Sequence, residues 1–459
     1  MEWSRPGDPP APRVLILGGG FAGVYTAFEL RKRLGRARAQ IDIVNRENFF
    51  VFYPMIPEIV SGAIETDDIL NPIRLVAPRT TLYVGEVTRI DLAAQTVDIL
   101  HGLYRHRQRE RTLAYDHVVL ALGGIPNTSR IPGLGEYAFD VQRLAHAFAL
   151  RNHLVDVLEQ GDIETHPVDK QRILTVVVVG GGANGVEVVA QIRDLMVDAA
   201  AHYPHLEPDD FRIVLVHGGD RLLPDLPASL ARYAERLLRD RGVEILLNRR
   251  VTRVEPTAVH LDDGTTIETE TIVGSVGVQP NPLVRDLPLS HDERGQIRVD
   301  DYLSTREFPN VWAVGDNALV IDPYTHRPYP QTAQHAIREA RVVAHNIAAR
   351  LQGESLEPIA YRTRGQMVAL GHRSAAVDAF GMTFSGFVAW WLWRTYYLAQ
   401  LPRWEKRLRV TFDWTLDLLF PPTLVQLKVG QTGPRTGAEE ATGAAPADVD
   451  TGRQGGSRG

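Results

Sequence analysis

The sequence of 459 residues contains no cysteine. This absence excludes structural disulfides, thiolate metal sites, CxxC redox pairs and cysteine nucleophiles together, so any redox chemistry must belong to a bound cofactor. We also expect no metal site. The formal net charge is -6, and no long basic run is interleaved with aromatic residues. The charge pattern of a nucleic-acid-binding protein is therefore missing as well, and we expect no nucleic acid partner.

Long hydrophobic segments are scarce too. The opening stretch MEWSRPGDPPAPR lacks a basic region followed by an apolar core, which predicts no secretion signal and a cytoplasmic location. No apolar stretch reaches the roughly 18 residues of a membrane-spanning helix, since Arg394 ends FSGFVAWWLW and Pro402 follows soon after. Hydrophobic residues nevertheless make up 44% of the chain. That share is enough for two or three cores, so we expect a multidomain protein.

Between two polar ends the sequence alternates predicted strands and helices. Residues 1–12 and 431–459 hold too few apolar residues to offset their ordering entropy, and we expect both to be disordered. Strand RVLILGGG, a helical pattern and strand QIDIVNRE then follow one another, and the same order restarts at ILTVVVV. A further helix is predicted over 142–159. The alternating arginines of 89–116 favour a solvent-exposed β-hairpin over a binding patch.

Two copies of the glycine pattern G-x-G-x-x-G each join a predicted strand to a predicted helix. One consists of Gly18, Gly20 and Gly23 around Phe21 and Ala22, and the other of Gly180, Gly182 and Gly185 around Asn184. In such a turn the first glycine makes a tight bend, the second lets backbone N–H groups approach a pyrophosphate, and the third lets the helix pack on the strand. Two copies in this context predict two dinucleotide sites rather than two packing positions.

The residue that ends the next strand departs from the usual pattern in both copies. An acid is expected there to bind the ribose, but the sequence has Asn45, followed by Arg46, in the first copy and His217 in the second. Asn45 can still pair with a ribose hydroxyl without a charge. His217 lacks the carboxylate that would repel a 2′-phosphate, and Arg221 lies close by in the sequence. NADPH therefore stays open beside NADH as the nucleotide of the second copy.

With both turns placed, the chain resembles the two-dinucleotide flavoproteins, whose first site holds FAD and whose second holds NAD(P)H. The stretches VVLALGG (118–124), FPNVWAVGDNA (308–318) and VGVQPNP (276–282) add to the resemblance. It implies an α/β, glutathione-reductase-like fold with two Rossmann-like dinucleotide-binding domains. It further implies that Asp316 binds the ribityl chain of FAD, that Gly277 lies near the nicotinamide, and that other FAD contacts come from Val87, Ala121, Gly123 and Gly315.

Within that superfamily the chain resembles most the type II, non-proton-pumping NADH:quinone oxidoreductases. The stretches GGGANGVEVVAQI, PQTAQHAIREA and YRTRGQMVALGHRSAAVDAFGMTFSGFVAWWLW carry the likeness, and the match runs from about Arg13 to Val429. The resemblance implies that a hydride passes from NADH to non-covalently bound FAD and that two electrons pass on to a membrane quinone of a respiratory chain. Similar reductases that pass electrons through cysteines do not fit the composition.

The resemblance also predicts the domain boundaries and a membrane surface as the partner of the C-terminal region. We expect an FAD-binding domain over 13–140 and 295–370, an NAD(P)H-binding domain over 141–294, and a C-terminal amphipathic helical region that lies on a membrane surface over 371–430. Five of the seven tryptophans lie in one stretch of 25 residues inside that region, beside arginines and lysines. This pattern suits a lipid headgroup interface. The alternative is a homodimer interface or a core helix pair. We expect a peripheral protein on the cytoplasmic face of the cell membrane.

Four side chains are candidates for the chemistry: Glu187, Gln334, Glu339 and Arg364. Glu187 is predicted in the first turn of the second glycine helix, where the helix dipole would stabilise its charge and the glutamate would stabilise the helix. The resemblance gives the alternative, in which Glu187 lies near nicotinamide and quinone as an electrostatic or proton-handling group. The resemblance places Ala333 and Gln334 beside flavin and quinone, with Gln334 as a neutral hydrogen-bond partner. Arg364 would stabilise charge on the reduced flavin or be a surface arginine. Glu339 would assist protons or be an exposed helical glutamate.

Two other functions stay open. An NAD(P)H-dependent reductase of a ferredoxin-like protein would need an exposed, charge-complementary docking face rather than an aromatic C-terminal segment. A redox-sensing flavoprotein with negligible turnover is compatible with the replaced residues Asn45, His217 and Arg338, the last of which stands where the AQxAxQE element of the resembled family has a glutamine. Steady-state NADH oxidation with a soluble quinone separates the sensor from the enzymes.

Overall fold

The computed structural model describes residues 11–34, 38–103, 107–416 and residue 425. Nearly all of the two ends for which we predict disorder lies outside that range.

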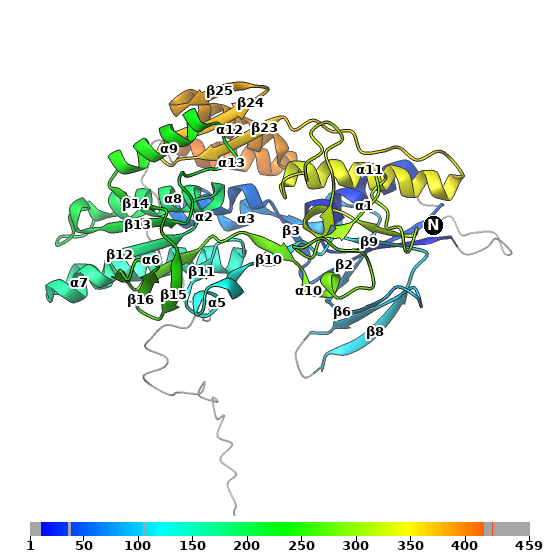
Figure 1. The fold of residues 1–459 in the computed structure, drawn as a ribbon, viewed down its shortest axis with the longest axis horizontal. Coiled ribbons are helices and arrows are strands. Elements are labelled where there is room, and N and C mark those ends of the chain that lie inside the picture. The colour runs from blue at the N-terminus through cyan, green and yellow to red at the C-terminus, as the bar shows by residue number, and fades with distance from the viewer. Residues whose placement is uncertain (1–10, 35–37, 104–106, 417–424, 426–459) are drawn as a thin grey trace, which may run out of the picture.

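Two five-stranded parallel sheets form the centres of two neighbouring lobes (Figure 1). The first sheet has the strand order β21 (Val311–Ala313), β9 (His117–Leu120), β1 (Arg13–Leu17), β2 (Gln40–Asn45) and β5 (Thr81–Val84). The second has the order β11 (Phe139–Asp140), β18 (Thr271–Gly274), β12 (Thr175–Val179), β13 (Arg212–His217) and β14 (Val243–Leu247). The central strands β1 and β12 are buried almost throughout, which is why their sequences are continuous apolar runs.

Helices cover these sheets. In the first lobe α1 (Phe21–Leu34) packs against α11 (Ala333–Gln352), and in the second lobe α8 (Ala183–Ala200) packs against α6 (Leu144–Ile163). The helix predicted over 142–159 is thus confirmed, and it continues a turn further. Further helices of the two lobes are α2 (Ile56–Ser61), α3 (Thr66–Ile69), α4 (Ile73–Val76), α5 (Leu134–Tyr137), α7 (Pro167–Ile173), α9 (Ala228–Asp240) and α10 (Pro282–Arg285).

A three-stranded antiparallel sheet is attached to each lobe. In the first lobe it consists of β6 (Glu86–Asp91), β7 (Thr96–His101) and β8 (Arg109–Ala114), and in the second of β15 (Val251–Glu255), β16 (Ala258–Leu261) and β17 (Thr266–Glu268). The hairpin predicted over 89–116 is confirmed in β7 and β8, and nearly all of β8 is exposed.

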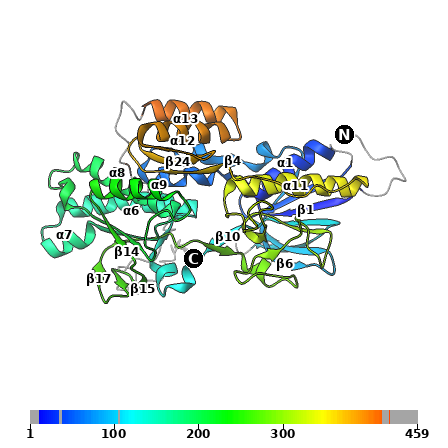
Figure 2. The same ribbon diagram turned by 45° about the horizontal axis from the view of Figure 1, so that its top comes forward.

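Short strands complete the fold. Between the two lobes, β10 (Gly124–Pro126) pairs antiparallel with β19 (Val278–Pro280), as Figure 2 shows. The other pairs are β3 (Phe49–Val51) with β4 (Leu70–Pro72) and β20 (Ile297–Arg298) with β22 (Ala318–Leu319).

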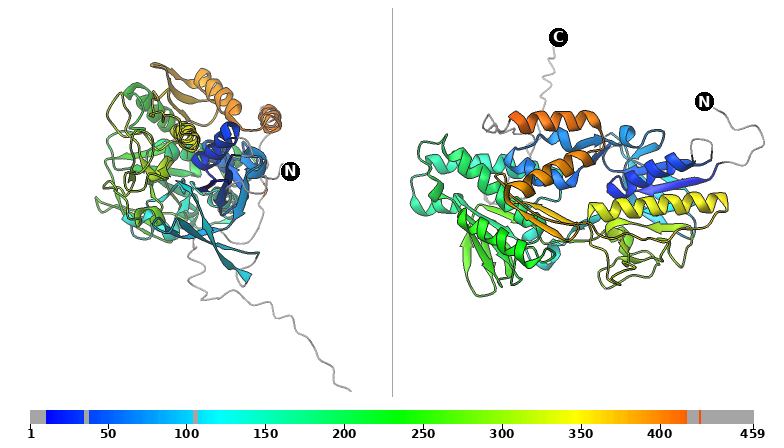
Figure 3. Two further views of the ribbon diagram at one scale, coloured as in Figure 1. Left: turned by 90° about the vertical axis from the view of Figure 1, so that its right-hand side faces the viewer. Right: turned by 90° about the horizontal axis from the view of Figure 1, so that it is seen from above.

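The C-terminal part of the chain forms an antiparallel sheet and two helices on the outside of the molecule (Figure 3). The sheet consists of β23 (Gly365–Ala369), β24 (Ala375–Ala379) and β25 (Met382–Ser385), followed by α12 (Gly386–Gln400) and α13 (Trp404–Leu416). This C-terminal part contacts both lobes, because β23 lies against α8 and α13 lies against α3. Among the helices that the structure describes, none has the length and apolar character needed to cross a membrane.

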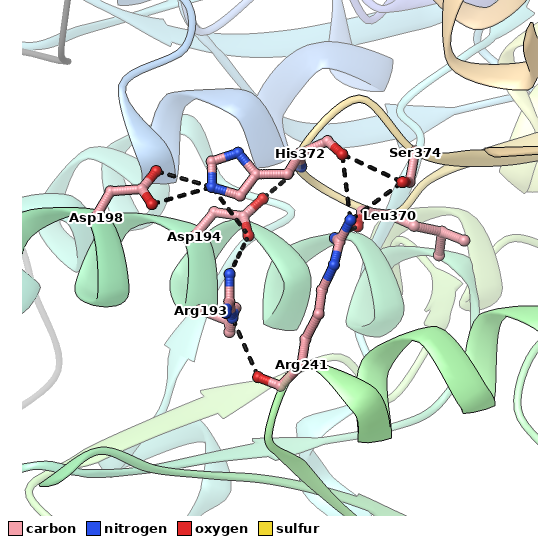
Figure 4. A network of polar contacts seen from close by, with 7 residues as sticks. All are labelled: Arg193, Asp194, Asp198, Arg241, Leu370, His372 and Ser374. Atoms are coloured by element: carbon pink, nitrogen blue, oxygen red, sulfur yellow. Dashed lines mark hydrogen bonds and ion pairs between the residues drawn. The ribbon is translucent and has the colours of Figure 1, made fainter. Parts of the chain in front are cut away.

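A polar network fixes the turn between β23 and β24 on the second lobe. It links Arg193, Asp194, Asp198, Arg241, Leu370, His372 and Ser374 (Figure 4). Asp194 on α8 accepts the backbone N–H of His372 at 2.6 Å, and the His372 ring lies 3.0 Å from an oxygen of Asp198. The guanidinium of Arg241 donates to backbone oxygens of the same turn. The hydrogen bonds of Asp198 and the charges of Asp194 and Asp198 raise the pKa of His372, which favours its charged form in this place.

Candidate functional site

Each glycine turn stands at the carboxyl edge of a parallel sheet. Gly18 follows β1 with a φ of +110°, and a Cβ on it would stand 2.0 Å from the backbone oxygen of Ala121. Gly180 follows β12 with a φ of +116°, and a Cβ on it would stand 2.0 Å from the backbone oxygen of Ser275. Only glycine fits at either position. The two lobes therefore build the same turn by the same contacts.

The middle glycine of each turn faces open space. A Cβ on Gly20 or Gly182 would meet no atom within 4 Å. A Cβ on Gly23 or Gly185 would instead stand 1.9 or 1.8 Å from the backbone oxygen of the turn's first glycine. The third glycine is thus a packing position, whereas the second leaves room for a ligand beside a helix N-terminus, where the dipole favours an anion. The pyrophosphate of FAD or NADH fits this cradle.

Asn45 and His217, which stand where an acid was expected, each form a hydrogen bond with a glycine turn. The side-chain oxygen of Asn45 accepts the backbone N–H of Gly19 at 2.8 Å, and Nδ1 of His217 lies 3.1 Å from the backbone nitrogen of Gly181. Burial lowers the pKa of His217, so its ring is neutral and Nδ1 can accept that N–H. The Asn45 amide nitrogen donates to the backbone oxygen of Glu47 at 2.8 Å. Asn45 and His217 therefore play one structural role, and ribose binding by Asn45 stays a prediction.

The segment after β21 closes the first site. Asp316 accepts the backbone N–H of Gly124 at 3.0 Å, and the side-chain amide of Asn317 donates to the backbone oxygen of Gly123 at 2.8 Å. These bonds join the ends of β9 and β21, which are neighbours in the first sheet. Burial raises the pKa of Asp316. A half-buried carboxylate next to the glycine turn is suited to the hydroxyl groups of a ribityl chain, as the resemblance implies.

Glu339 supports the same segment from α11. Its carboxylate accepts the backbone N–H of Gly315 at 2.6 Å, and Gly315 in turn lies against Ala22 at the start of α1. Glu339 is buried, so the alternative of an exposed helical glutamate is wrong. Burial, together with the charge of Asp316, raises its pKa to about 7. A proton on Glu339 would therefore be exchanged near neutral pH, beside Gly315 and Asp316 of the predicted flavin site.

The start of α11 is tied to the strand that follows it. Ala333 is its first residue, and Gln334 donates to the backbone oxygen of Gly365 at 3.0 Å and accepts the hydroxyl of Tyr361 at 3.1 Å. The guanidinium of Arg338 lies over the Tyr361 ring at 5.1 Å. Arg364 is exposed, as its surface-arginine alternative requires. The cation of Arg338 therefore lies beside Tyr361, and charge stabilisation by Arg364 stays a prediction.

Glu187 lies buried in the second turn of α8, not in the first turn that the sequence predicted, at the contact with the C-terminal sheet. It accepts the backbone N–H of Ala369 at 2.9 Å. Burial, with the charge of Glu58 on α2, raises the pKa of Glu187 to about 8. Glu58 is itself buried. Sequence analysis did not single out Glu58, because a glutamate in a six-residue helix carries no local signal of burial beside a second carboxylate.

Replacing Glu187 by glutamine is expected to flatten the dependence of stability on pH. The ordinary pKa of a glutamate, 4.5, is raised to about 8 in the folded protein, so folding retains a proton that the unfolded chain releases between these values. Stability therefore falls as the pH rises through this window. Wild type should lose about 4 kcal/mol more than Glu187→Gln between pH 5 and pH 8, by denaturant midpoints. The exposed control Glu354→Gln should behave as wild type, and equal losses for all three proteins would contradict the assignment.

The other predicted contacts lie around the two turns. Phe21 is buried at the start of α1, and Val87 is buried in β6. Arg46 is exposed in an ion pair, and Asn184 is half-buried in the first turn of α8. Gly277 precedes β19 with a φ of +79° and faces open space. Their contacts with a nucleotide stay predictions.

The C-terminal tryptophans divide into buried and exposed ones. Trp393 and Trp414 are buried, and the guanidinium of Arg394 lies 4.3 Å from the ring centres of both Trp390 and Trp414. The alternative of a core helix pair is thus confirmed for these side chains, which join α12 to α13.

Exposed apolar side chains lie on the same two helices and on the hairpin before them. On α13 the exposed residues Trp404, Leu408, Phe412 and Leu416 follow one another at four-residue spacing and so share one face. Further exposed apolar side chains are Phe380, Met382, Phe387, Val388 and Trp391. This set of nine residues is called the outer apolar face below. An apolar face of this extent marks a surface that binds a partner or a membrane.

Two parallel sheets, each with a glycine turn that has room for a pyrophosphate, define a protein that binds two dinucleotides, of the flavoprotein reductase class. Residues 12–340 match the model of the pyridine nucleotide-disulphide oxidoreductase family, and residues 364–421 match the NDH2 C-terminal domain. The chain belongs to this family and, within it, to the type II NADH:quinone oxidoreductases.

Individual relatives agree with this assignment. The chain is 31% identical to the type II NADH:quinone oxidoreductase Ndh of Mycobacterium tuberculosis, over 90% of this chain and 89% of the relative. It is also 31% identical to the demethylphylloquinone reductase NdbB of Synechocystis, over 88% of this chain and 95% of the relative. The fold is similar to the structure of NDH2 from Plasmodium falciparum in complex with NADH, with a TM-score of 0.82 and 18% identity over 90% of this chain and 99% of that one.

Proposed function

We propose that the protein oxidises NADH and reduces a membrane quinone, without pumping protons. The observation that carries the proposal is the pair of glycine turns, each with open space beside its middle glycine at the edge of a parallel sheet. FAD, held at the first turn and by Asp316, supplies the hydride-accepting and electron-donating chemistry. Because the chain has no cysteine, electrons leave for the quinone without a disulfide relay. Membership of the type II family supports NADH as donor and a quinone as acceptor.

Side chains near the start of α8 and at the start of α11 exchange protons and form hydrogen bonds in this reaction. Glu187 keeps its proton at neutral pH and exchanges it near pH 8, as its raised pKa requires. Gln334 offers a neutral amide beside Tyr361 and the cation of Arg338. Reduction of a quinone consumes protons, so groups that exchange protons near neutral pH suit this place.

We further propose that the protein sits peripherally on the cytoplasmic face of the cell membrane, with the outer apolar face in contact with lipid. Apolar stripes on two helices next to the exposed cations Arg407 and Arg409 are the pattern of a helix that lies in a headgroup interface. A lipid-soluble acceptor would reach the enzyme from that side. A homodimer interface on the same face is the competing interpretation.

An anaerobic titration tests the reaction. NADH added to the purified yellow protein should bleach the flavin absorbance, and a soluble quinone added afterwards should restore it. Quinone mixed with the oxidised protein before NADH serves as the control and should change nothing. If NADH leaves the absorbance unchanged, the donor is wrong, and if the bleached protein is not reoxidised by quinone, the acceptor is wrong.

A further inference from the structure

We propose that the adenosine end of the second site is built for a 2′-phosphate, so that NADPH is used at least as efficiently as NADH. This inference rests on the proposed function, since it assumes that a nicotinamide nucleotide occupies the second turn. Its structural basis is the loop after β13, where a neutral histidine stands in place of a carboxylate and where the side chain of Arg250, which follows β14 and forms no ion pair with the described residues, lies alongside.

The first part of the basis is the end of β13. A carboxylate at this point binds the 2′-hydroxyl of NAD and repels the 2′-phosphate of NADP. Here the position is His217, whose Nδ1 is engaged by the backbone N–H of Gly181. Its other ring nitrogen, Nε2, lies 2.7 Å from the place that a Cβ on Gly219 would take, so the ring lies over this loop. A histidine brings no negative charge in either protonation state, and the ring of His217 also has a hydrogen bond with the backbone of Arg221.

The second part is Arg250, which the sequence did not point to. It follows β14, and its Cγ, Nε and Cδ lie 3.2, 3.6 and 3.9 Å from the place that a Cβ on Gly218 would take. The exposed side chain of Arg250 therefore runs along the loop directly after His217. The position is fixed by the backbone, because Arg249 N–H donates to the backbone oxygen of His217 at 3.1 Å and Arg250 N–H donates to Asp262.

The charges around this loop favour Arg250 as the phosphate partner. Among the residues that the structure describes, no ion pair involves the Arg250 guanidinium, whereas that of neighbouring Arg249 pairs with Asp263 at 2.7 Å. Arg221, which lies close in sequence, donates instead to the backbone oxygen of Pro224 at 2.6 Å. An exposed guanidinium on a fixed backbone matches the planar, two-pronged hydrogen bonding that phosphate prefers.

The first lobe offers an internal comparison. Its equivalent turn is held by Asn45, and the arginine that follows, Arg46, is neutralised by Glu86 at 3.2 Å. FAD carries no 2′-phosphate, so a neutralised cation is adequate there. Asp220 is the acid within the second loop itself, and it is exposed. The second lobe thus combines an uncharged turn acceptor with an arginine whose guanidinium forms no ion pair with the described residues, although the backbone N–H of Arg250 donates to Asp262.

Two variants of His217, to asparagine and to aspartate, have the same shape and separate the effect of a negative charge from that of the hydrogen bond to the glycine turn. His217→Asn keeps an acceptor for Gly181 N–H, as Asn45 does in the first lobe, and should leave the ratio of kcat/KM for NADPH to that for NADH unchanged. His217→Asp adds only a charge and should lower that ratio about tenfold or more. Equal ratios in the two variants would overturn the role of charge at the end of β13.

A second pair tests the arginine. Arg250→Gln should lower kcat/KM for NADPH about tenfold, the loss expected for one hydrogen bond to a charged group, and leave that for NADH unaltered. Arg249→Gln, whose parent side chain is paired with Asp263, is the matched control and should leave both values unaltered. Equal losses with NADH and NADPH in Arg250→Gln would show a structural role and overturn the assignment.

A flavin-independent measurement separates this inference from the proposed function. Calorimetry on the holoenzyme should find adenosine 2′,5′-bisphosphate bound about tenfold more tightly than 5′-AMP, and this preference should vanish in Arg250→Gln. Wild-type kcat/KM higher for NADH than for NADPH, or equal binding of the two probes, would overturn the inference and leave the oxidoreductase function intact. Failure of both nucleotides to bleach the flavin would instead sink the proposed function.

Discussion

A Gly20→Ala variant is expected to fold normally and yet to be recovered without FAD, as a colourless protein. A Cβ on Gly20 meets no protein atom within 4 Å, so the methyl group has room in the fold. The same space is the one that the pyrophosphate needs, and a methyl group there keeps the backbone from approaching it. The flavin-to-protein absorbance ratio measures the loss, and unfolding of the variant should match that of wild-type protein stripped of FAD.

Gly18→Ala is the matched contrast at the other end of the same turn. A Cβ there stands 2.0 Å from the backbone oxygen of Ala121 at a φ of +110°, so β1 and β9 would have to separate. This variant should lose more than about 3 kcal/mol of stability, with or without flavin. In the second lobe Gly182→Ala should retain FAD and lose NADH binding. A yellow Gly20→Ala protein with full FAD content would contradict the location of the first site.

Charging the outer apolar face is expected to release the protein from membranes. In the triple variant Trp404→Glu, Leu408→Glu and Phe412→Glu, three exposed side chains of one helix face would no longer favour lipid. Binding to vesicles of phosphatidylethanolamine and phosphatidylglycerol should fall by more than about a hundredfold, since each large apolar side chain contributes about 1.5 kcal/mol or more when buried. Co-sedimentation with vesicles measures the change.

The control places two glutamates on exposed apolar side chains elsewhere. Ile163→Glu with Val168→Glu alters the second lobe, and this double variant should sediment with vesicles as wild type does. The triple variant should still oxidise its nucleotide with a water-soluble quinone. Undiminished vesicle binding of the triple variant, or a change from dimer to monomer with no change in vesicle binding, would show that the face is a protein interface.

Sequence alone predicted the parts of the site that depend on local backbone chemistry. The two glycine turns could be placed because a strand, a residue with positive φ and a helix follow one another within a few positions, as at Gly18 and Gly180. The roles of Asn45 and His217 could not, because each depends on a turn residue 26 or 36 positions earlier. Strand register brings those pairs together, and no local pattern encodes it.

Burial of charged groups was the other element that sequence did not reveal. Glu339 lies on a helix whose polar residues are otherwise exposed in part, and Glu58 lies on a short helix that is buried throughout. Only the packing of neighbouring elements covers the two carboxylates. The raised pKa of Glu187 likewise comes from its burial and from the charge of Glu58 on α2, which is far from α8 in sequence. The amphipathic character of the C-terminal region, by contrast, was anticipated, because its tryptophans beside arginines and lysines can be seen in the sequence itself.

The helix α8 also sets the order in which the chain acquires its structure. Glu187 and Asp194 lie two turns apart on nearly the same side of this helix, and each accepts one backbone N–H, from Ala369 and His372. The ribosome makes these acceptors 182 and 178 residues before it makes their donors. Since domains generally fold from the N-terminus during synthesis, the second lobe forms first and the late hairpin docks on a finished helix. A nascent chain that ends before Gly365 therefore already contains both glycine turns, and the outer apolar face, through which we propose that the protein binds a membrane, is made only after them.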